Sequence, residues 1–245
     1  MPRPPYKRPP ITEAVIEIRF VQPVKVDREH SIIKKFRSEY GDCQEFTSYD
    51  VKFDITGSNI TQDTTPHLGF RFSSADMTEL VILSESSFAV SQLAPYPGWE
   101  KFIARLVRDW RTWQRAMGFR DVQRIGVRYI NRIDLPIEGP LLNYADYLNV
   151  YPHFPNTLGP TSAYAVQAHI PLPEMKCTLS LNTAIVQSPL PDFLSIVFDQ
   201  DIGRDVQPPQ YEEEIVQLLQ EIHDKKNEVF EESITTKARE IFNRE

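Results

Sequence analysis

Three arginines on one side of a predicted strand are the residues whose types and spacing bear most directly on chemistry. Arg124, Arg128 and Arg132 recur every fourth residue in RIGVRYINRI, where apolar and polar positions alternate. Alternation with period two is typical of a strand, so the three guanidinium groups are expected on one face. Guanidinium groups bind carboxylates and phosphates through paired hydrogen bonds. The spacing therefore predicts a face that binds an anionic group or the acidic surface of a partner.

A fourth arginine holds the equivalent place in an earlier strand, TEAVIEIRF. An offset of 109 residues carries Arg19 onto Arg128. The same offset carries apolar residues onto apolar residues: Ile16, Ile18 and Phe20 onto Ile125, Val127 and Tyr129, and Leu106, Trp110 and Trp113 onto Ile215, Leu219 and Ile222. This agreement predicts an internal duplication. The alternative is chance agreement among a few apolar positions.

The elements that position these residues follow from hydrophobic periodicity and turn residues. Strands are expected at 12–20, 47–55, 67–74, 78–93, 124–136, 161–172, 175–187 and 192–202. Helices are expected at 27–42, 99–118, 143–151 and 211–242, the last with a separate terminal segment. In helix 99–118 the aromatic stripe is expected in the core, and Arg105, Arg108, Arg111 and Arg115 on the wet face.

These elements predict an α+β protein. Two strand–helix–(three or four strands)–helix units would form a curved, largely antiparallel sheet with helices on one face. The expected organisation is a proline-rich arm (1–10), a first repeat (11–119), a second repeat (120–230) and a C-terminal helix (231–245). The open face would carry Glu17, Arg19, Arg124, Arg128 and Arg132, and by the same alternation Asp50, Lys52, Arg71, Gln167, His169, Ser180 and Asn182.

Each of these side chains also has a structural interpretation. The arginines are expected to form salt bridges with Glu13, Glu17 and Asp134, which contribute little when exposed. Asn131 interrupts the apolar face and needs a hydrogen-bond partner if it is buried. Asp199 and Asp201 have the spacing to share a strand face, and we expect solvated charges at the end of a strand.

The histidines offer two further interpretations. His223, Asn227 and Phe230 share one helical face, which favours a core or subunit-contact role for the histidine. The alternative is a general base in a groove between the repeats, with His223 or His169 acting beside an arginine. No two histidines have the spacing of metal ligands, so neither a metal nor a cofactor is predicted.

The net charge, the cysteine content and the missing motifs disfavour several classes of protein. The net charge of −7 counts against a surface devoted to nucleic acid. Cys43 and Cys177 form no metal or disulfide pattern, and neither a signal peptide nor an apolar run of about 20 residues is present, so a cytoplasmic protein without a membrane segment is expected. Glycine elbows, P-loops and dinucleotide-binding motifs are missing from the sequence.

The last helical segment, ESITTKAREIF, predicts a partner. Ser233 or Thr235 is expected to cap a separate helix. Its apolar residues Ala238, Ile241 and Phe242 would then be exposed, which favours a homodimer through the C-terminal helices.

Three stretches, PPITEAVIEIRF, RIGVRYINRI and IHDKKNEVFEESITTKAREIF, together resemble the signatures of a sporadically distributed prokaryotic protein family of unknown function. The matching residues are Pro10, Ile11, Glu13, Arg128, Tyr129, Asn131, Arg132, His223, Ser233 and Thr235. The resemblance spans nearly the whole chain. It implies a role on mobile or defence islands and supplies no established activity.

From these observations we expect a non-enzymatic binding or scaffolding protein that presents its arginine-bearing sheet face to a protein or a small anionic ligand. The candidate contact residues are Arg19, Arg124, Arg128, Arg132, Asn131, His169, His223 and Asn227. One alternative is an enzyme with a site in the groove between the repeats. A second alternative is nucleic-acid binding on the open sheet face.

Overall fold

The computed structural model describes residues 6–25, 30–56, 59–137, 143–155, 157–158, 161 and 163–243, without the side chains of 48–56 and 59–67. The strands are β1 (Ile11–Phe20), β2 (Asp42–Thr56), β3 (Asn59–Ser73), β4 (Glu79–Ser84), β5 (Ser87–Leu93), β6 (Val122–Pro136), β7 (Ala165–Leu172), β8 (Cys177–Val186) and β9 (Phe193–Arg204). The helices are α1 (Ser31–Tyr40), α2 (Trp99–Met117), α3 (Glu212–Ser233) and α4 (Thr236–Asn243), with 3-10 turns η1 (Tyr144–Asp146) and η2 (Pro173–Met175).

The predicted α+β class is confirmed, because helices pack on sheet strands that pair antiparallel with their neighbours along the chain. The chain divides into two compact units. The N-terminal unit comprises Ile16–Leu93 and Pro97–Ile125, and the C-terminal unit comprises Met1–Val15, Ala94–Tyr96 and Gly126–Glu245. Strands β1 and β6 contribute residues to both units.

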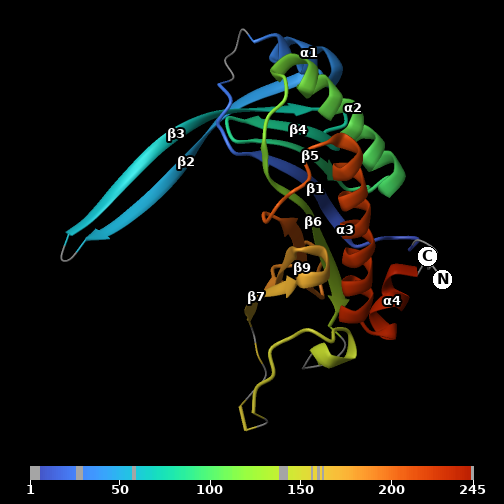
Figure 1. Ribbon diagram of the computed structural model, residues 1–245. Helices are drawn as coiled ribbons and strands as arrows, with labels where there is room; N and C mark the ends of the chain where they lie inside the picture. Colours follow the sequence, from blue (N-terminus) through green and yellow to red (C-terminus); the bar gives the residue numbers. More distant parts are fainter. Residues whose placement is uncertain are drawn as a thin grey trace. The chain divides into compact units, whose positions relative to one another are not determined.

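In the N-terminal unit the strand order is β2-β3-β4-β5-β1-β6. Helices α1 and α2 lie on this sheet (Figure 1). Phe20 stacks on Trp113 at 4.5 Å between ring centroids, and Trp113 stacks on Trp110 at 5.0 Å. Helix α1 begins where the His30 side chain accepts a hydrogen bond from the Ile32 amide, and it ends at Gly41, whose φ of 92° favours glycine.

In the C-terminal unit the strand order is β1-β6-β9-β8-β7, and α3 runs beside β9 (Figure 1). Phe198 of β9 meets Phe230 of α3 edge to face, with ring centroids 5.9 Å apart.

The alternation predicted for β1 and for β6 is confirmed, because the apolar side chains of both strands are buried: Ile16, Ile18, Phe20, Ile125, Val127 and Tyr129. Within the described residues, no helix has the length and apolarity needed to cross a membrane.

One expectation about regular structure needs correction, and a second is not confirmed. The helix expected over 143–151 is only the turn η1, because Leu148 forms an antiparallel β-bridge with Ile234 directly after this turn. The internal duplication is not established, since the ten-residue helix α1 follows β1 whereas this short turn follows β6. Apolar periodicity recurs wherever strands and helices pack, so agreement at one offset does not require common architecture.

The terminal helix is separate, as predicted, but its apolar face is covered within the chain. The chain is extended at Ile234, and the Thr235 hydroxyl then accepts a hydrogen bond from the Ala238 amide at 3.4 Å. Ala238 and Phe242 are buried, and Phe242 packs against Tyr6 from the described part of the N-terminal arm. Of the three apolar residues expected to dock on a second copy, Ala238 and Phe242 are therefore covered within the chain and Ile241 is half-buried. Residues 1–5 of the arm lie outside the description.

Candidate functional site

The open face of the sheet in the C-terminal unit carries a fixed cluster of polar side chains. Arg128 binds both carboxylate oxygens of Asp199, with Nε–Oδ1 and Nη2–Oδ2 distances of 2.9 and 2.7 Å. The Asn182 amide from β8 donates to the same carboxylate at 3.3 Å. The hydrogen bond with Asp199 also raises the pKa of Arg128 above its ordinary value. Asp199 is therefore a buried, ion-paired carboxylate in mid-strand, which corrects the expectation of a solvated strand-end charge.

The open face also holds a second ion pair along β6. Arg132 Nε lies 3.0 Å from Asp134 Oδ1, two residues further along the same strand. The Ser195 hydroxyl of β9 donates to that oxygen as well. This pairing with Asp134 is the one that the structural interpretation of the sequence predicts, and it leaves the side chain of Arg132 39% exposed.

The other two arginines belong to the N-terminal unit. Arg19 Nε lies 2.8 Å from Glu17 Oε2, and Arg124 Nη1 lies 3.4 Å from the same oxygen. All four arginines proposed from the sequence thus lie beside carboxylates. Arg19 and Arg124 lie beside Glu17 in the N-terminal unit, whereas Arg128 and Arg132 belong to the C-terminal unit. Among the other residues expected on the open face, Asp50 and Lys52 lie outside the described side chains.

Further along the C-terminal unit's open face, β7 and β8 contribute uncharged polar groups. His169 Nδ1 lies 3.0 Å from the Ser180 hydroxyl, its neighbour across the strand pair. Gln167 pairs in register with Asn182 and is exposed. A serine beside a histidine resembles a nucleophile beside a base. Both side chains also supply hydrogen-bonding groups to the open face, where a polar surface can contact them.

The histidine of the last signature faces the interior of the C-terminal unit. His223 Nδ1 lies 3.5 Å from the Tyr129 hydroxyl, and its Nε2 lies 3.0 Å from the Asn227 amide nitrogen. The Tyr129 hydroxyl in turn lies 2.8 Å from that of Tyr96. Both imidazole nitrogens therefore have protein partners, which disfavours a base that takes a proton from a substrate.

A lysine occupies the position next to this histidine in the interior. Lys226 is 6% exposed, and its ammonium nitrogen lies 3.8 Å from the centroid of the Tyr129 ring, a cation–π contact. Burial lowers the pKa of Lys226 to about 7. The sequence placed Asn227 on the apolar face, but the buried positions of α3 include Lys226 and Phe230. Asn227 is exposed at the margin of that face.

Burial and the nearby Lys226 charge lower the pKa of His223 from 6.5 to about 3. Between pH 6.5 and 3 the unfolded chain takes up a proton that the folded chain refuses, so acid should destabilise the fold over this window. The slope is at most about 1.4 kcal/mol per pH unit. We expect the free energy of unfolding of wild type, relative to His223→Gln, to stay constant above pH 6.5 and to fall below it in urea titrations. Parallel curves for the two proteins down to pH 4 would show that the histidine is not held neutral.

Asn131 is a structural residue. It is 3% exposed, and its amide donates to the Phe198 carbonyl of β9 at 3.0 Å. This bond supplies the partner that a buried asparagine requires.

In the part of the chain that the structure describes, histidines, cysteines and acidic residues do not gather in a group of three that could hold a metal ion.

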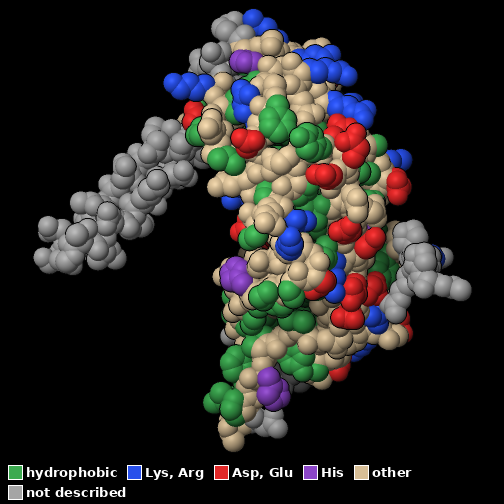
Figure 2. Space-filling view, in the orientation of Figure 1, with side chains coloured by type: hydrophobic (Ala, Val, Ile, Leu, Met, Phe, Trp, Pro, Cys, Tyr) green, Lys and Arg blue, Asp and Glu red, His purple; other side chains and the backbone are tan. Residues whose placement is uncertain are grey.

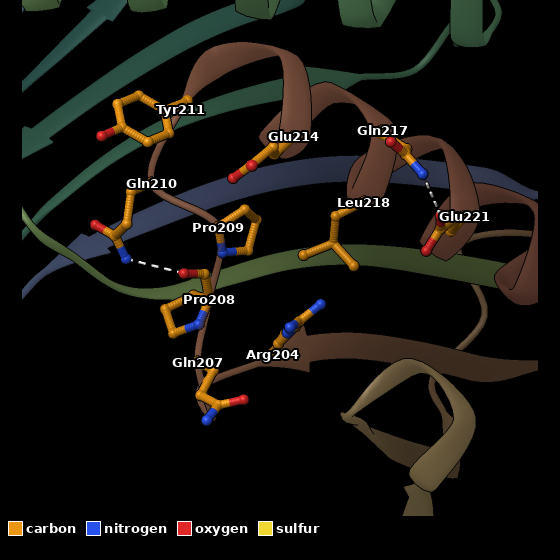
Figure 3. A pocket seen from close by; sticks show the side chains of 10 residues that line it. All are labelled: Arg204, Gln207, Pro208, Pro209, Gln210, Tyr211, Glu214, Gln217, Leu218 and Glu221. Atoms are coloured by element: carbon orange, nitrogen blue, oxygen red, sulfur yellow. Dashed lines mark hydrogen bonds between the residues drawn. The ribbon is translucent and has the colours of Figure 1, made fainter.

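A groove that the sequence did not indicate follows β9. Its volume is about 410 Å³, and Figure 3 shows its lining: Arg204, Gln207, Pro208, Pro209, Gln210, Tyr211, Glu214, Gln217, Leu218 and Glu221. Arg204 Nε donates to the Val206 carbonyl at 3.3 Å, and no carboxylate among the described residues pairs with its guanidinium group. The available signal was an arginine followed closely by two prolines and a tyrosine. Their composition is that of an ordinary loop, so they attracted no prediction.

The fold and these side chains define an α+β sheet protein with a polar open sheet face and a polar layer beneath α3. The residues of the three signatures meet in the C-terminal unit. The Pro10 carbonyl accepts from the Arg132 amide at 2.9 Å, Tyr129 lies beside His223, and the Thr235 amide donates to the Tyr147 carbonyl at 3.0 Å. Comparison of the chain with models of known protein families and with curated proteins finds no match.

Proposed function

We propose that this chain is a non-enzymatic binding protein that presents the open sheet face of its C-terminal unit to a protein partner. The observation that carries the proposal is the cluster of Arg128, Asp199 and Asn182, in which two strands and a buried carboxylate fix an exposed guanidinium group. Side chains that are already ordered lose little conformational entropy when they bind. A face built this way is preorganised for specific contact.

The charge balance of this face favours a protein over a free anion. Arg128 and Arg132 each lie beside an aspartate, so the ion pairs neutralise most of their positive charge. Phosphate or nucleic acid is attracted by unpaired cationic groups. A protein surface offers donors and acceptors together, which suits side chains of both charges and the neighbouring Gln167 and His169.

The groove beyond β9 is a second candidate ligand site, and its lining includes one arginine and two glutamates, Arg204, Glu214 and Glu221. The Val206 carbonyl holds Arg204 Nε, and among the described residues the two terminal nitrogens of Arg204 have no hydrogen-bond partner, so they suit a small ligand that carries an anionic group together with donors for the glutamates. Tyr211, at 65% exposure, and two prolines lie on the same groove (Figure 3). Exposed tyrosine and arginine side chains are the types that anchor binding partners.

The resemblance to a sporadically distributed prokaryotic family also stays a proposal. Its support is that residues of separate signatures contact one another, notably Tyr129 with His223 and Pro10 with Arg132. A context on mobile or defence islands would place the binding partner among proteins encoded nearby.

Site-specific photo-crosslinking tests the proposed binding face. A benzoylphenylalanine at Thr178, an exposed open-face position of β8, should capture a defined protein from an extract of the source cells. The same group at Glu228, on the exposed side of α3, should capture none. Capture of the same proteins from both positions, or of none at Thr178, would count against the open face as the binding surface.

A further inference from the structure

Strand β7 is the last strand of its sheet, and no described strand pairs with its outer edge. An edge strand presents backbone N–H and C=O groups without partners, and another chain readily pairs with them. Soluble proteins commonly protect such edges with charged side chains, proline or bulges. The outward backbone N–H and C=O groups of β7 therefore need hydrogen-bond partners.

The pairing of β7 with β8 fixes which backbone groups point outward. The Ile185 amide donates to the Tyr164 carbonyl at 3.2 Å, so this pair belongs to the hydrogen-bonded positions of the antiparallel ladder. Counting by twos along the register, the backbone groups of Ala165, Gln167 and His169 point away from β8. Pro171 is the next position and has no N–H, so it ends this row of donors.

The edge lies in an unusually uncharged part of the chain. Residues 147–173 contain no Asp, Glu, Lys or Arg, although 25% of the whole chain is charged. On the surface over β7 and the segment that leads into it, Figure 2 shows mainly hydrophobic and uncharged polar groups. Ile170 is 41% exposed and Phe154 is 44% exposed. The usual charged protection of an edge strand is therefore missing where the outward backbone groups lie.

We propose that β7 pairs antiparallel with β7 of a second copy of this chain, about a two-fold axis at Gln167. This register uses all three outward positions, with Gln167 opposite its own counterpart and Ala165 opposite His169 of the second copy. It forms about six backbone hydrogen bonds. Ile170 then lies opposite Tyr164 of the second copy.

Charge favours a second copy as the occupant of this edge. In a two-fold interface every residue near the axis meets the same residue, so a charged side chain there would meet a like charge. β7 carries none, whereas the chain as a whole has a net charge of −7 that opposes self-association elsewhere. A strongly charged partner segment would find no opposite charge on β7 itself.

This interface differs from the one that the sequence suggested. The C-terminal helix buries Ala238 and Phe242 within the chain, so its apolar face offers a second copy little exposed surface. The β7 interface does not depend on the proposed partner-binding function. It leaves two side chains outside the backbone pairing: Asn182, on the strand next to β7, and Arg128, three strands from β7.

A charge-swap experiment tests the interface. In sedimentation equilibrium the wild-type chain should have twice its monomer mass of 28.4 kDa. Gln167→Lys and Gln167→Glu each place like charges across the axis and should weaken the dimer about tenfold or more. An equimolar mixture of the two variants should restore the dimer, because lysine then faces glutamate.

Thr178→Lys supplies the control, because it adds the same charge at an exposed position of the neighbouring strand and should leave the dimer intact. The far-ultraviolet circular dichroism of every variant should match wild type, because the side chains at positions 167 and 178 are exposed. A monomeric wild type would overturn the proposal. So would a dimer that both Gln167 variants leave unchanged, since it would use another surface.

Discussion

Asp109→Ala is expected to lower the free energy of unfolding by about 3–5 kcal/mol, the largest single effect among the charged residues discussed. Asp109 is fully buried between α1 and α2 in the N-terminal unit. It accepts hydrogen bonds from the Tyr40 hydroxyl and from Arg108 Nε, the latter at 2.8 Å. Without the carboxylate, the buried Tyr40 hydroxyl and Arg108 Nε lose their hydrogen-bond acceptor. Urea unfolding followed by tryptophan fluorescence measures the change.

The cost comes from the buried groups joined to the carboxylate through Tyr40, because Arg105 Nη1 lies 3.4 Å from the same Tyr40 hydroxyl. Arg105 is 6% exposed and donates to the Ser91 carbonyl at 2.7 Å and the Leu80 carbonyl at 3.2 Å. Burial and the negative charge of Asp109 raise the pKa of Tyr40, so this hydroxyl stays protonated and donates to the carboxylate. Asp109, Tyr40 and Arg105 therefore form one buried network, and removing its fully buried carboxylate is costly although Glu79 lies 3.9 Å from Arg105 Nε.

Glu100→Ala is the matched control, because it removes an exposed acid from the same helix. Its loss should stay within about 1 kcal/mol, the contribution of an acid in the first turn of a helix. Equal losses for the two variants would show that burial of Asp109 does not set the effect.

Arg128→Ala is expected to lower the free energy of unfolding by about 2–4 kcal/mol, more than Asp199→Asn at about 1 kcal/mol. The asymmetry follows from exposure: the Arg128 side chain is 49% exposed, whereas that of Asp199 is 7% exposed. Losing the arginine leaves a buried carboxylate that still accepts a hydrogen bond from the Asn182 amide but has lost its cationic partner. Losing the negative charge leaves a guanidinium group that can turn to water. Denaturant titrations of both variants measure the difference.

Arg132→Ala controls for the loss of an arginine from the same strand. Its partner Asp134 is 21% exposed at the side chain, so water can replace the guanidinium and the loss should stay below about 1 kcal/mol. If Asp199→Asn proved as destabilising as Arg128→Ala, the buried carboxylate would not be the reason for the pairing. The result also decides whether a binding defect in Arg128→Ala reports on contact or on folding.

Local patterns in the sequence were sufficient for most of the elements. Period-two alternation defined β1 and β6 and the buried side of each, including Ile16 and Tyr129. The apolar stripe defined α2, and the Thr235 cap separated α4 from α3. These features depend on neighbouring residues in the chain, because strand pleating, helical spacing and capping act over a few residues.

Burial of charged groups depended on the tertiary structure. In α2 the sequence assigned Arg105 to the wet face, yet the strand carbonyls of Leu80 and Ser91 accept its hydrogen bonds and hold it in the interior. Lys226 likewise lies over the Tyr129 ring, although the sequence pattern gave the apolar face of α3 to Asn227. A charged residue is stable in the core only when segments distant in the sequence supply hydrogen-bond or ion-pair partners. The local periodicity of the sequence does not identify those partners.

The sequence by itself determined the α+β class, the alternating strands and the residue types available on the open face. Only the tertiary structure decided that Asp199 neutralises Arg128, that the terminal helix is covered by its own chain, and that β7 forms an uncharged edge. The physical reason is the same in each case. Side-chain direction follows from backbone geometry, whereas a side chain's partner follows from which strands pair, and pairing joins residues far apart in the chain.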